Sequence, residues 1–179
     1  DSNFVFDYSA IDNVAIKAAY FPSGGASNVE SSTELGIQWT GIDGLDVRLA
    51  SGENNMQSTA ANTPNGKVDA SAFYVGYTID SISIGMQNNE SDSDTANEDE
   101  DFTSYGISYA VSDDLSVSYN MSEVDYENTS LSDQEATGVS FSYTSGGMTV
   151  SGAWSDVENV GGTATADNSG YELNLSFAF

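Results

Sequence analysis

The final stretch of the chain, "SGYELNLSFAF" at residues 169–179, decides how the rest of the sequence is interpreted. Read in steps of two from the end, one face carries Phe179, Phe177, Leu175, Leu173 and Tyr171, and the other carries polar or small residues. Strict alternation of this kind indicates a strand with one apolar and one polar face. Because chain ends usually fray into solvent, an aromatic last residue raises the question of what the apolar face contacts.

The same alternation recurs along the whole chain. Eleven segments show it, at residues 3–10, 14–21, 33–41, 45–52, 69–79, 81–88, 101–111, 115–122, 136–145, 148–155 and 170–179. Short turns rich in Asn, Asp and Gly alternate with long polar loops at 22–32, 53–68, 89–100, 123–135 and 156–169. The pattern predicts an all-β chain in one domain, residues 1–179, folded as an antiparallel meander with all the tight turns at one end.

Composition excludes several functions. The chain has 179 residues, 28 Asp plus Glu against 3 Lys plus Arg, a formal charge of -25, and neither Cys nor His. This charge argues against a nucleic-acid partner, since phosphate binding needs a basic patch. Without His, the commonest general base is missing, and no nucleophile motif is present. We therefore expect no enzyme activity and no cofactor.

Aromatic residues distinguish a lipid-facing surface from the buried face of a β-sandwich, which would show the same alternation. On the apolar face, one aromatic stands a few residues before each tight turn: Tyr8, Trp39, Tyr77, Tyr109 and Tyr143. A sandwich core has no reason to collect Tyr and Trp at one height, whereas a membrane interface does. We predict an antiparallel transmembrane β-barrel whose aromatic girdle contains these five residues together with Phe177 and Phe179.

Two stretches resemble a known family. The start, "DSNFVFDYSAIDNVAIKAAY" at 1–20, resembles the hairpin that follows the constriction loop of Gram-negative trimeric porins, and "LNLSFAF" at 173–179 resembles the C-terminal signal of outer-membrane barrels. The resemblance implies the C-terminal portion of an outer-membrane porin, a water-filled channel for passive diffusion of small hydrophilic solutes and ions. It also implies a homotrimer, contacts with outer-membrane lipid and lipopolysaccharide, and recognition of the last strand by the outer-membrane assembly machinery.

The odd number of strands leaves the architecture open. Bacterial barrels have an even strand number, and the resemblance implies sixteen, so five strands and the constriction loop are expected before Asp1. A miscounted strand would instead give a self-contained barrel of ten or twelve. Two other functions are considered: a secreted acidic β-rich adhesin or filament subunit, and a small outer-membrane barrel with a plugged lumen.

The strand charges mark a candidate pore wall. Alternation places them on the polar face, where a wet lumen spares them the roughly 2–4 kcal/mol cost of a lipid-facing charge. Asp7 and Lys17 lie four residues on either side of the first turn, which predicts that they are neighbours. The predicted pore-lining patch contains Asp7, Lys17, Glu34, Gln38, Asp46 and Arg48. It is either a selectivity filter or a set of hydrated cross-strand ion pairs.

The long loops carry sixteen acidic residues, which predicts an outer vestibule that concentrates cations. Within them, "SDSDTANEDED" at 91–101 offers Asp92, Asp94, Glu98 and Asp99 as candidate ligands for a divalent cation. The run lacks the glycine and spacing of an EF-hand loop. A solvated, mutually repulsive loop is the alternative interpretation, and no defined metal site is predicted.

Overall fold

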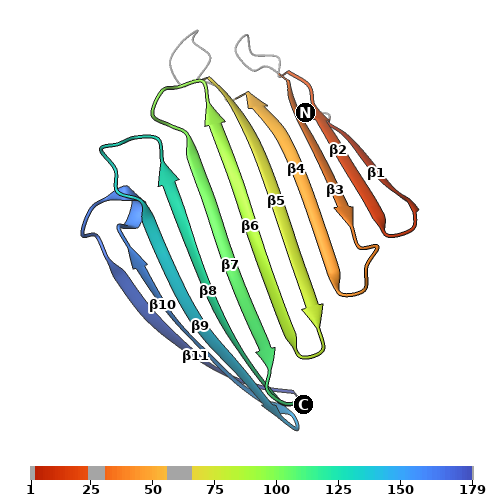
Figure 1. Cartoon of the computed structure of the whole chain (residues 1–179), viewed down its shortest axis with the longest axis vertical. Coiled ribbons are helices and arrows are strands. Elements are labelled where there is room, and N and C mark those ends of the chain that lie inside the picture. Colours follow the sequence, from red (N-terminus) through yellow and green to blue (C-terminus); the bar gives the residue numbers. More distant parts are fainter. Residues whose placement is uncertain (1–2, 24–30, 56–65, 179) are drawn as a thin grey trace.

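A computed structural model describes residues 3–23, 31–55 and 66–178. It contains one eleven-stranded antiparallel sheet in which each strand pairs with the next in sequence order, as Figure 1 shows. The strands are β1 (Phe4–Ile11), β2 (Val14–Phe21), β3 (Ser32–Trp39), β4 (Leu45–Asn55), β5 (Lys67–Ile79), β6 (Ile82–Ser93), β7 (Glu100–Ala110), β8 (Leu115–Tyr126), β9 (Gln134–Ser145), β10 (Met148–Glu158) and β11 (Asn168–Phe177), with a 3₁₀ turn, η1 (Val160–Gly162), before the last. The prediction of an all-β chain with eleven antiparallel strands is confirmed.

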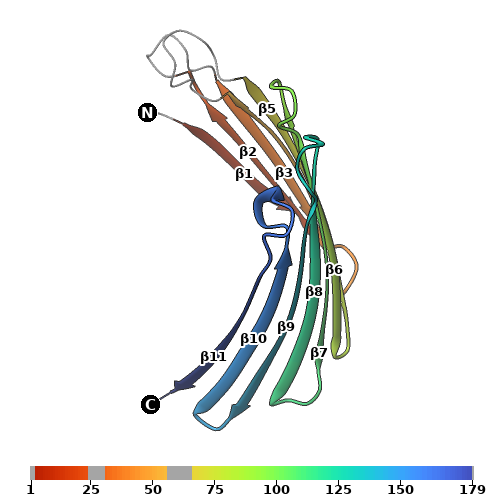
Figure 2. The ribbon, with the colours of Figure 1, turned by 90° about the vertical axis from the view of Figure 1, so that its left-hand side faces the viewer.

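The sheet is strongly curved and open. Figure 2 shows it as an arc, with both ends of the chain on the concave side. Within the described ranges, β1 and β11 occupy the two ends of the strand order and do not pair. Closure and a total of sixteen strands therefore stay predictions. No helix in the described part of the chain is long and apolar enough to cross a bilayer.

The two faces of the sheet differ in chemistry. Residues directly opposite on paired strands share a face, so the register extends each strand's alternation across the whole sheet. The hollows in the sheet surface are lined mainly by Ser, Ala, Gly and Asn. The face that carries these residues is therefore the concave one. The convex face carries most of the large apolar residues. Among the described residues none of these is buried, and Ile107 in mid-strand is 47% exposed. A sheet that forms a single layer has to bury its apolar face against another apolar layer or medium.

The strands extend further toward the long loops than the alternation predicts. β6 continues to Ser93 instead of ending at 88, β8 to Tyr126 instead of 122, and β10 to Glu158 instead of 155. Backbone pairing needs no apolar side chains, so a ladder can continue where both faces are polar and hydrated. The predicted loop boundaries at 89–100, 123–135 and 156–169 are wrong for this reason.

The turn between β3 and β4 is docked onto β5. Gly44 has a φ of 76°, and its carbonyl oxygen accepts a hydrogen bond from the Thr78 N–H at 2.8 Å. A Cβ atom at Gly44 would lie 2.1 Å from the Thr78 carbonyl oxygen. Glycine is thus required there by its conformation and by the close approach of β5.

We expect Gly44→Ala to lower the free energy of unfolding by about 2–4 kcal/mol, because left-handed strain and a backbone clash add. Gly146→Ala is the matched control, since Gly146 has a φ of 60° but open space around its Cβ position. The control should cost only about 1 kcal/mol. Urea unfolding in lipid vesicles measures both. Equal losses would show that the contact with β5 is unimportant.

Candidate functional site: the concave wall

The first charged group on the concave wall is a cross-strand pair. Asp7 on β1 lies directly opposite Lys17 on β2, and the Lys17 Nζ is 3.5 Å from an Asp7 carboxylate oxygen. Both side chains are open to solvent, 78% exposed for Lys17 and 63% for Asp7. An exposed pair of this kind stabilises by less than about 1 kcal/mol, so the Lys17 ammonium is only loosely held.

The second charged group is more tightly organised. Arg48 on β4 donates from Nε to both carboxylate oxygens of Asp46, at 3.1 and 3.0 Å, and from Nη2 to the same carboxylate. Gln38 on β3 lies directly opposite Arg48, and its Nε2 donates to the Asp46 carboxylate at 3.0 Å. The Arg48 guanidinium also lies over the ring of Tyr74. Sequence reasoning missed Tyr74. The sequence does contain a signal: Tyr74 stands between Phe73 and Val75 of the apolar face, so the alternation places it on the polar face.

The six predicted pore-lining residues therefore share the concave face, but the register separates them into groups. Lys17 lies opposite Gly36 on β3, not opposite Gln38. Glu34 lies between Ala19 and Gly52, which carry no charge. The register and the β3–β4 turn thus set which strand charges lie opposite one another within the predicted patch. That these residues line a pore stays a prediction.

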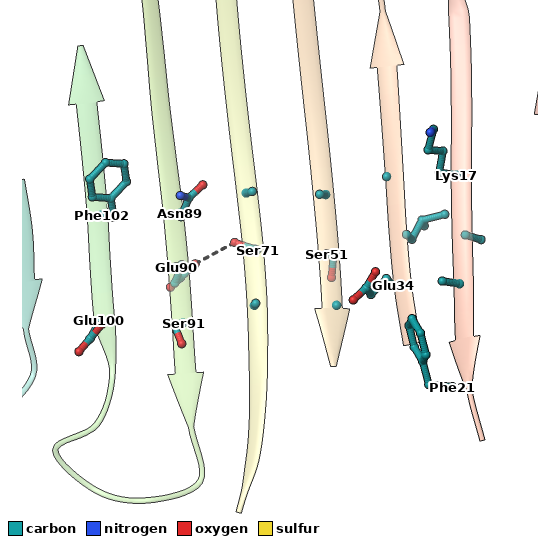
Figure 3. A pocket seen from close by; sticks show the side chains of 18 of the residues that line it. Lys17, Phe21, Glu34, Ser51, Ser71, Asn89, Glu90, Ser91, Glu100 and Phe102 are labelled. Carbon is teal, nitrogen blue, oxygen red and sulfur yellow. Dashed lines mark hydrogen bonds between the residues drawn. The ribbon is translucent and has the colours of Figure 1, made fainter. Parts of the chain in front are cut away.

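A hollow of about 920 Å³ lies toward the long-loop end of this wall. Figure 3 shows it spread over β2 to β7, with Lys17 and Glu34 on one side and Asn89 and Glu100 on the other. Its floor is made of Ala and Gly, and Phe21 and Phe102 line it. Both aromatics occupy positions of the polar face, so they were not among the predicted wall residues.

Toward the C-terminal strands the wall is rich in hydroxyls. Serine and threonine side chains hydrogen-bond in pairs across neighbouring strands, at 2.7 Å for Ser118 and Ser140 and 3.0 Å for Thr144 and Thr149. A second hollow of about 390 Å³ lies over this region, with Glu172 as its charged residue. The concave wall thus has a charged side on β1 to β4 and a nearly neutral hydroxyl side on β8 to β10.

The predicted girdle aromatics are on the opposite, convex face. Tyr8, Trp39, Tyr77, Tyr109, Tyr143 and Phe177 are all exposed. The rings of Phe6 and Tyr8 stack with centroids 6.2 Å apart. Phe179 lies outside the described residues. That these side chains meet a membrane interface stays a prediction.

Most acidic residues of the outer strand ends lie on the convex face. The carboxylates on the convex side, named here the convex acidic row, are Glu53, Asp69, Glu90, Asp92, Asp101, Glu123, Asp125, Glu135, Asp156 and Glu158. Eight of them were assigned to long loops. The expectation of an acidic vestibule is wrong for these eight, because they belong to strands whose alternation directs them outward.

The convex acidic row lies at a constant height. β4 begins with Leu45 at the short-turn end, and Glu53 lies eight residues after it. β5 ends with Ile79 at the same end, and Asp69 lies ten residues before it. With about 3.3 Å per residue and a tilt near 40°, the apolar part below the row is about 20–25 Å tall. That height matches the apolar band of a membrane barrel, so the row lies outside the membrane-spanning part.

The predicted cation ligands do not converge. Asp99 accepts a hydrogen bond from the Ser93 N–H at 2.7 Å, and Asp94 accepts one from the Lys67 N–H at 3.3 Å. Among the described residues, the acidic group close enough to share an ion is a different one: Glu123, Asp125 and Asp133. The run 91–101 does not form one loop, because it is divided between β6, the connection at 94–99 and β7. Its carboxylates order the turn instead.

Comparisons with known proteins agree with this geometry. The model of the Gram-negative porin family matches residues 1–179. In vitro folded OmpT, an outer membrane protein of Vibrio cholerae, has a TM-score of 0.67 at 19% identity, covering 100% of this chain and 64% of OmpT. Outer-membrane expressed OmpT gives 0.67 at 20% identity, with 100% and 65% covered. A loop L8 deletion mutant of OmpT gives 0.63 at 24% identity, with 99% and 62% covered.

These likenesses concern the fold, and the chain spans less than two thirds of the length of those OmpT chains. No curated protein sequence matches it. The family match covers every residue, including both stretches that carry the resemblance. The chain belongs to the Gram-negative porin family, whose members lie in the bacterial outer membrane.

Proposed function

We propose that the full-length protein forms a water-filled channel for passive diffusion of small hydrophilic solutes and ions. The observation that carries this proposal is the division of the faces. The convex side presents exposed Ile, Leu, Val, Phe and Tyr, and the concave side presents Ser, Gly, Asn and a few ion pairs. Such a wall suits lipid outside and water inside. The outer-membrane location excludes the secreted adhesin.

The runner-up is an outer-membrane barrel with a plugged lumen. The nearly neutral hydroxyl side of the wall favours the channel, since exposed Ser and Thr pairs are compatible with mobile water. We expect discrete conductance steps when the purified full-length protein is added to planar bilayers. Proteoliposomes should also swell in small sugars. Correctly folded protein that inserts but conducts nothing would favour the plugged barrel.

We propose a homotrimer, insertion by the outer-membrane assembly machinery through β11, and contact of the convex face with outer-membrane lipid and lipopolysaccharide. β11 supports the second of these, because Tyr171, Leu173, Leu175 and Phe177 share its exposed convex face. Native electrophoresis of the full-length protein with its heat-dissociated form as the control tests the trimer.

A further inference from the structure

Tyr74 is an aromatic residue on the concave wall, most of which carries small or polar side chains. It lies on β5 directly opposite Arg48 on β4 and Gln87 on β6. The Arg48 Cζ atom is 5.2 Å from the centre of the Tyr74 ring. At that distance a guanidinium is attracted by the negative face of the ring. Tyr74 therefore contacts the side chain that carries one of the two positive charges on the described concave wall.

Two glycines form a seat for the Tyr74 ring. Gly76 lies two residues further along β5 on the same face, and a Cβ there would be 2.3 Å from the Tyr74 Oη and 2.9 Å from its Cζ. Gly85 on β6 lies directly opposite Gly76, and its Cβ would be 3.7 Å from the same Oη. The phenol thus lies close along the wall, in space that a side chain at position 76 would fill.

Arg48 is held from two directions. Asp46 binds its guanidinium through Nε and Nη2, which compensates the charge, and the Tyr74 ring lies against it from a second side. The Arg48 side chain is 57% exposed, against 78% for Lys17. Lys17 has a single carboxylate contact at 3.5 Å. The two cations of the wall are therefore presented to the lumen differently.

We propose that Tyr74 is a positioning residue for ion selectivity. By lying over Gly76 and Gly85, it keeps the Arg48 guanidinium against Asp46, so that Lys17 is the more accessible cation of this wall. The inference rests on the proposed channel function. It assigns a role to Tyr74 that depends on Arg48, and this dependence distinguishes positioning from a simple effect on pore width.

The test is the reversal potential of the full-length protein in planar bilayers under a potassium chloride gradient. Tyr74→Ala should free the Arg48 guanidinium to extend toward the ion path. A unit charge brought within roughly 8 Å of that path in water should lower the cation-to-anion permeability ratio about two-fold. In an Arg48→Gln background, Tyr74→Ala should leave the ratio unchanged. Tyr74→Phe retains the ring and should match the wild type.

The glycine seat supplies a matched pair of variants that keep every lumen side chain. Gly76→Ala must displace the phenol and should lower the ratio as Tyr74→Ala does, again only when Arg48 is present. Gly85→Ala makes only ordinary contacts, at 3.6 Å or more, and should have no effect. If Tyr74→Ala does not fold, this pair carries the test.

The outcomes separate the two proposals. A folded wild-type protein without conductance overturns the channel function. A conducting wild type in which Tyr74→Ala or Gly76→Ala shifts the ratio equally with and without Arg48, or not at all, overturns only the role of Tyr74. Higher salt should shrink the expected shift, because ions screen a charge at the lumen surface.

Discussion

Replacing Ile107 by arginine should lower the free energy of unfolding in lipid vesicles by about 2–4 kcal/mol. Ile107 lies on the convex face of β7, directly opposite Ile84 on β6 and Tyr119 on β8. It is close to the middle of the apolar band. An arginine side chain there can bring its guanidinium to the membrane interface only by leaving its preferred conformation. The loss should appear in urea titrations of the full-length protein followed by tryptophan fluorescence.

Ser108→Arg is the control for this prediction. Ser108 is the next residue of β7 but lies on the concave face, where it lines the smaller hydroxyl-rich hollow. A hydrated arginine there should change the free energy of unfolding by less than about 0.5 kcal/mol. Similar losses at both positions would mean that the convex face does not contact lipid. A larger loss at Ser108 would reverse the assignment of the faces.

Neutralising part of the convex acidic row should stabilise the protein by about 1 kcal/mol at low ionic strength. Carboxylates lie directly opposite one another across neighbouring strands: Glu123 faces Glu135, Glu135 faces Glu158, and Asp101 faces Asp125. Each like-charged pair costs a few tenths of a kcal/mol. The triple variant Glu123→Gln, Asp125→Asn, Glu135→Gln removes all three repulsions.

The same repulsion sets a pH dependence. The Asp125 carboxylate, then burial, then the Glu135 and Asp133 carboxylates raise the pKa of Glu123 above its ordinary value. The folded protein therefore binds this proton more tightly than the unfolded chain, so stability should fall as pH rises from the ordinary to the raised pKa. Glu123→Gln should weaken that dependence.

Divalent cations give a second measurement of the acidic row. Millimolar Mg²⁺ should raise the melting temperature of the wild type, and a chelator should reverse the rise, because the ion screens and bridges opposed carboxylates. The triple variant should respond less. Glu34→Gln, whose cross-strand neighbours are Ala19 and Gly52, is the control and should respond like the wild type. An unchanged Mg²⁺ response in the triple variant would contradict the prediction.

The amino-acid sequence determined the strand number and the assignment of faces in mid-strand. Period-two alternation is a local property, and each apolar residue marks the face of its neighbours. Lys17 and Arg48 could be placed on the polar face because Ile16, Ala18, Val47 and Leu49 flank them. Aromatic positions before the tight turns were evident for the same reason, since each is counted from its own hairpin.

Where the alternation of apolar and polar residues no longer marks the faces, only the tertiary structure decided the arrangement of the side chains. Beyond the apolar band both faces are polar, so alternation could not show that Glu123 and Glu135 belong to strands and point outward. The alternation also gave no information about contacts between strands, since these depend on the register and on where glycine leaves space. Tyr74 reaches its position because Gly76 leaves room for the ring, and Arg48 meets Tyr74 because the register places the two residues opposite each other. A local pattern identifies faces, whereas pairing across strands determines which side chains meet.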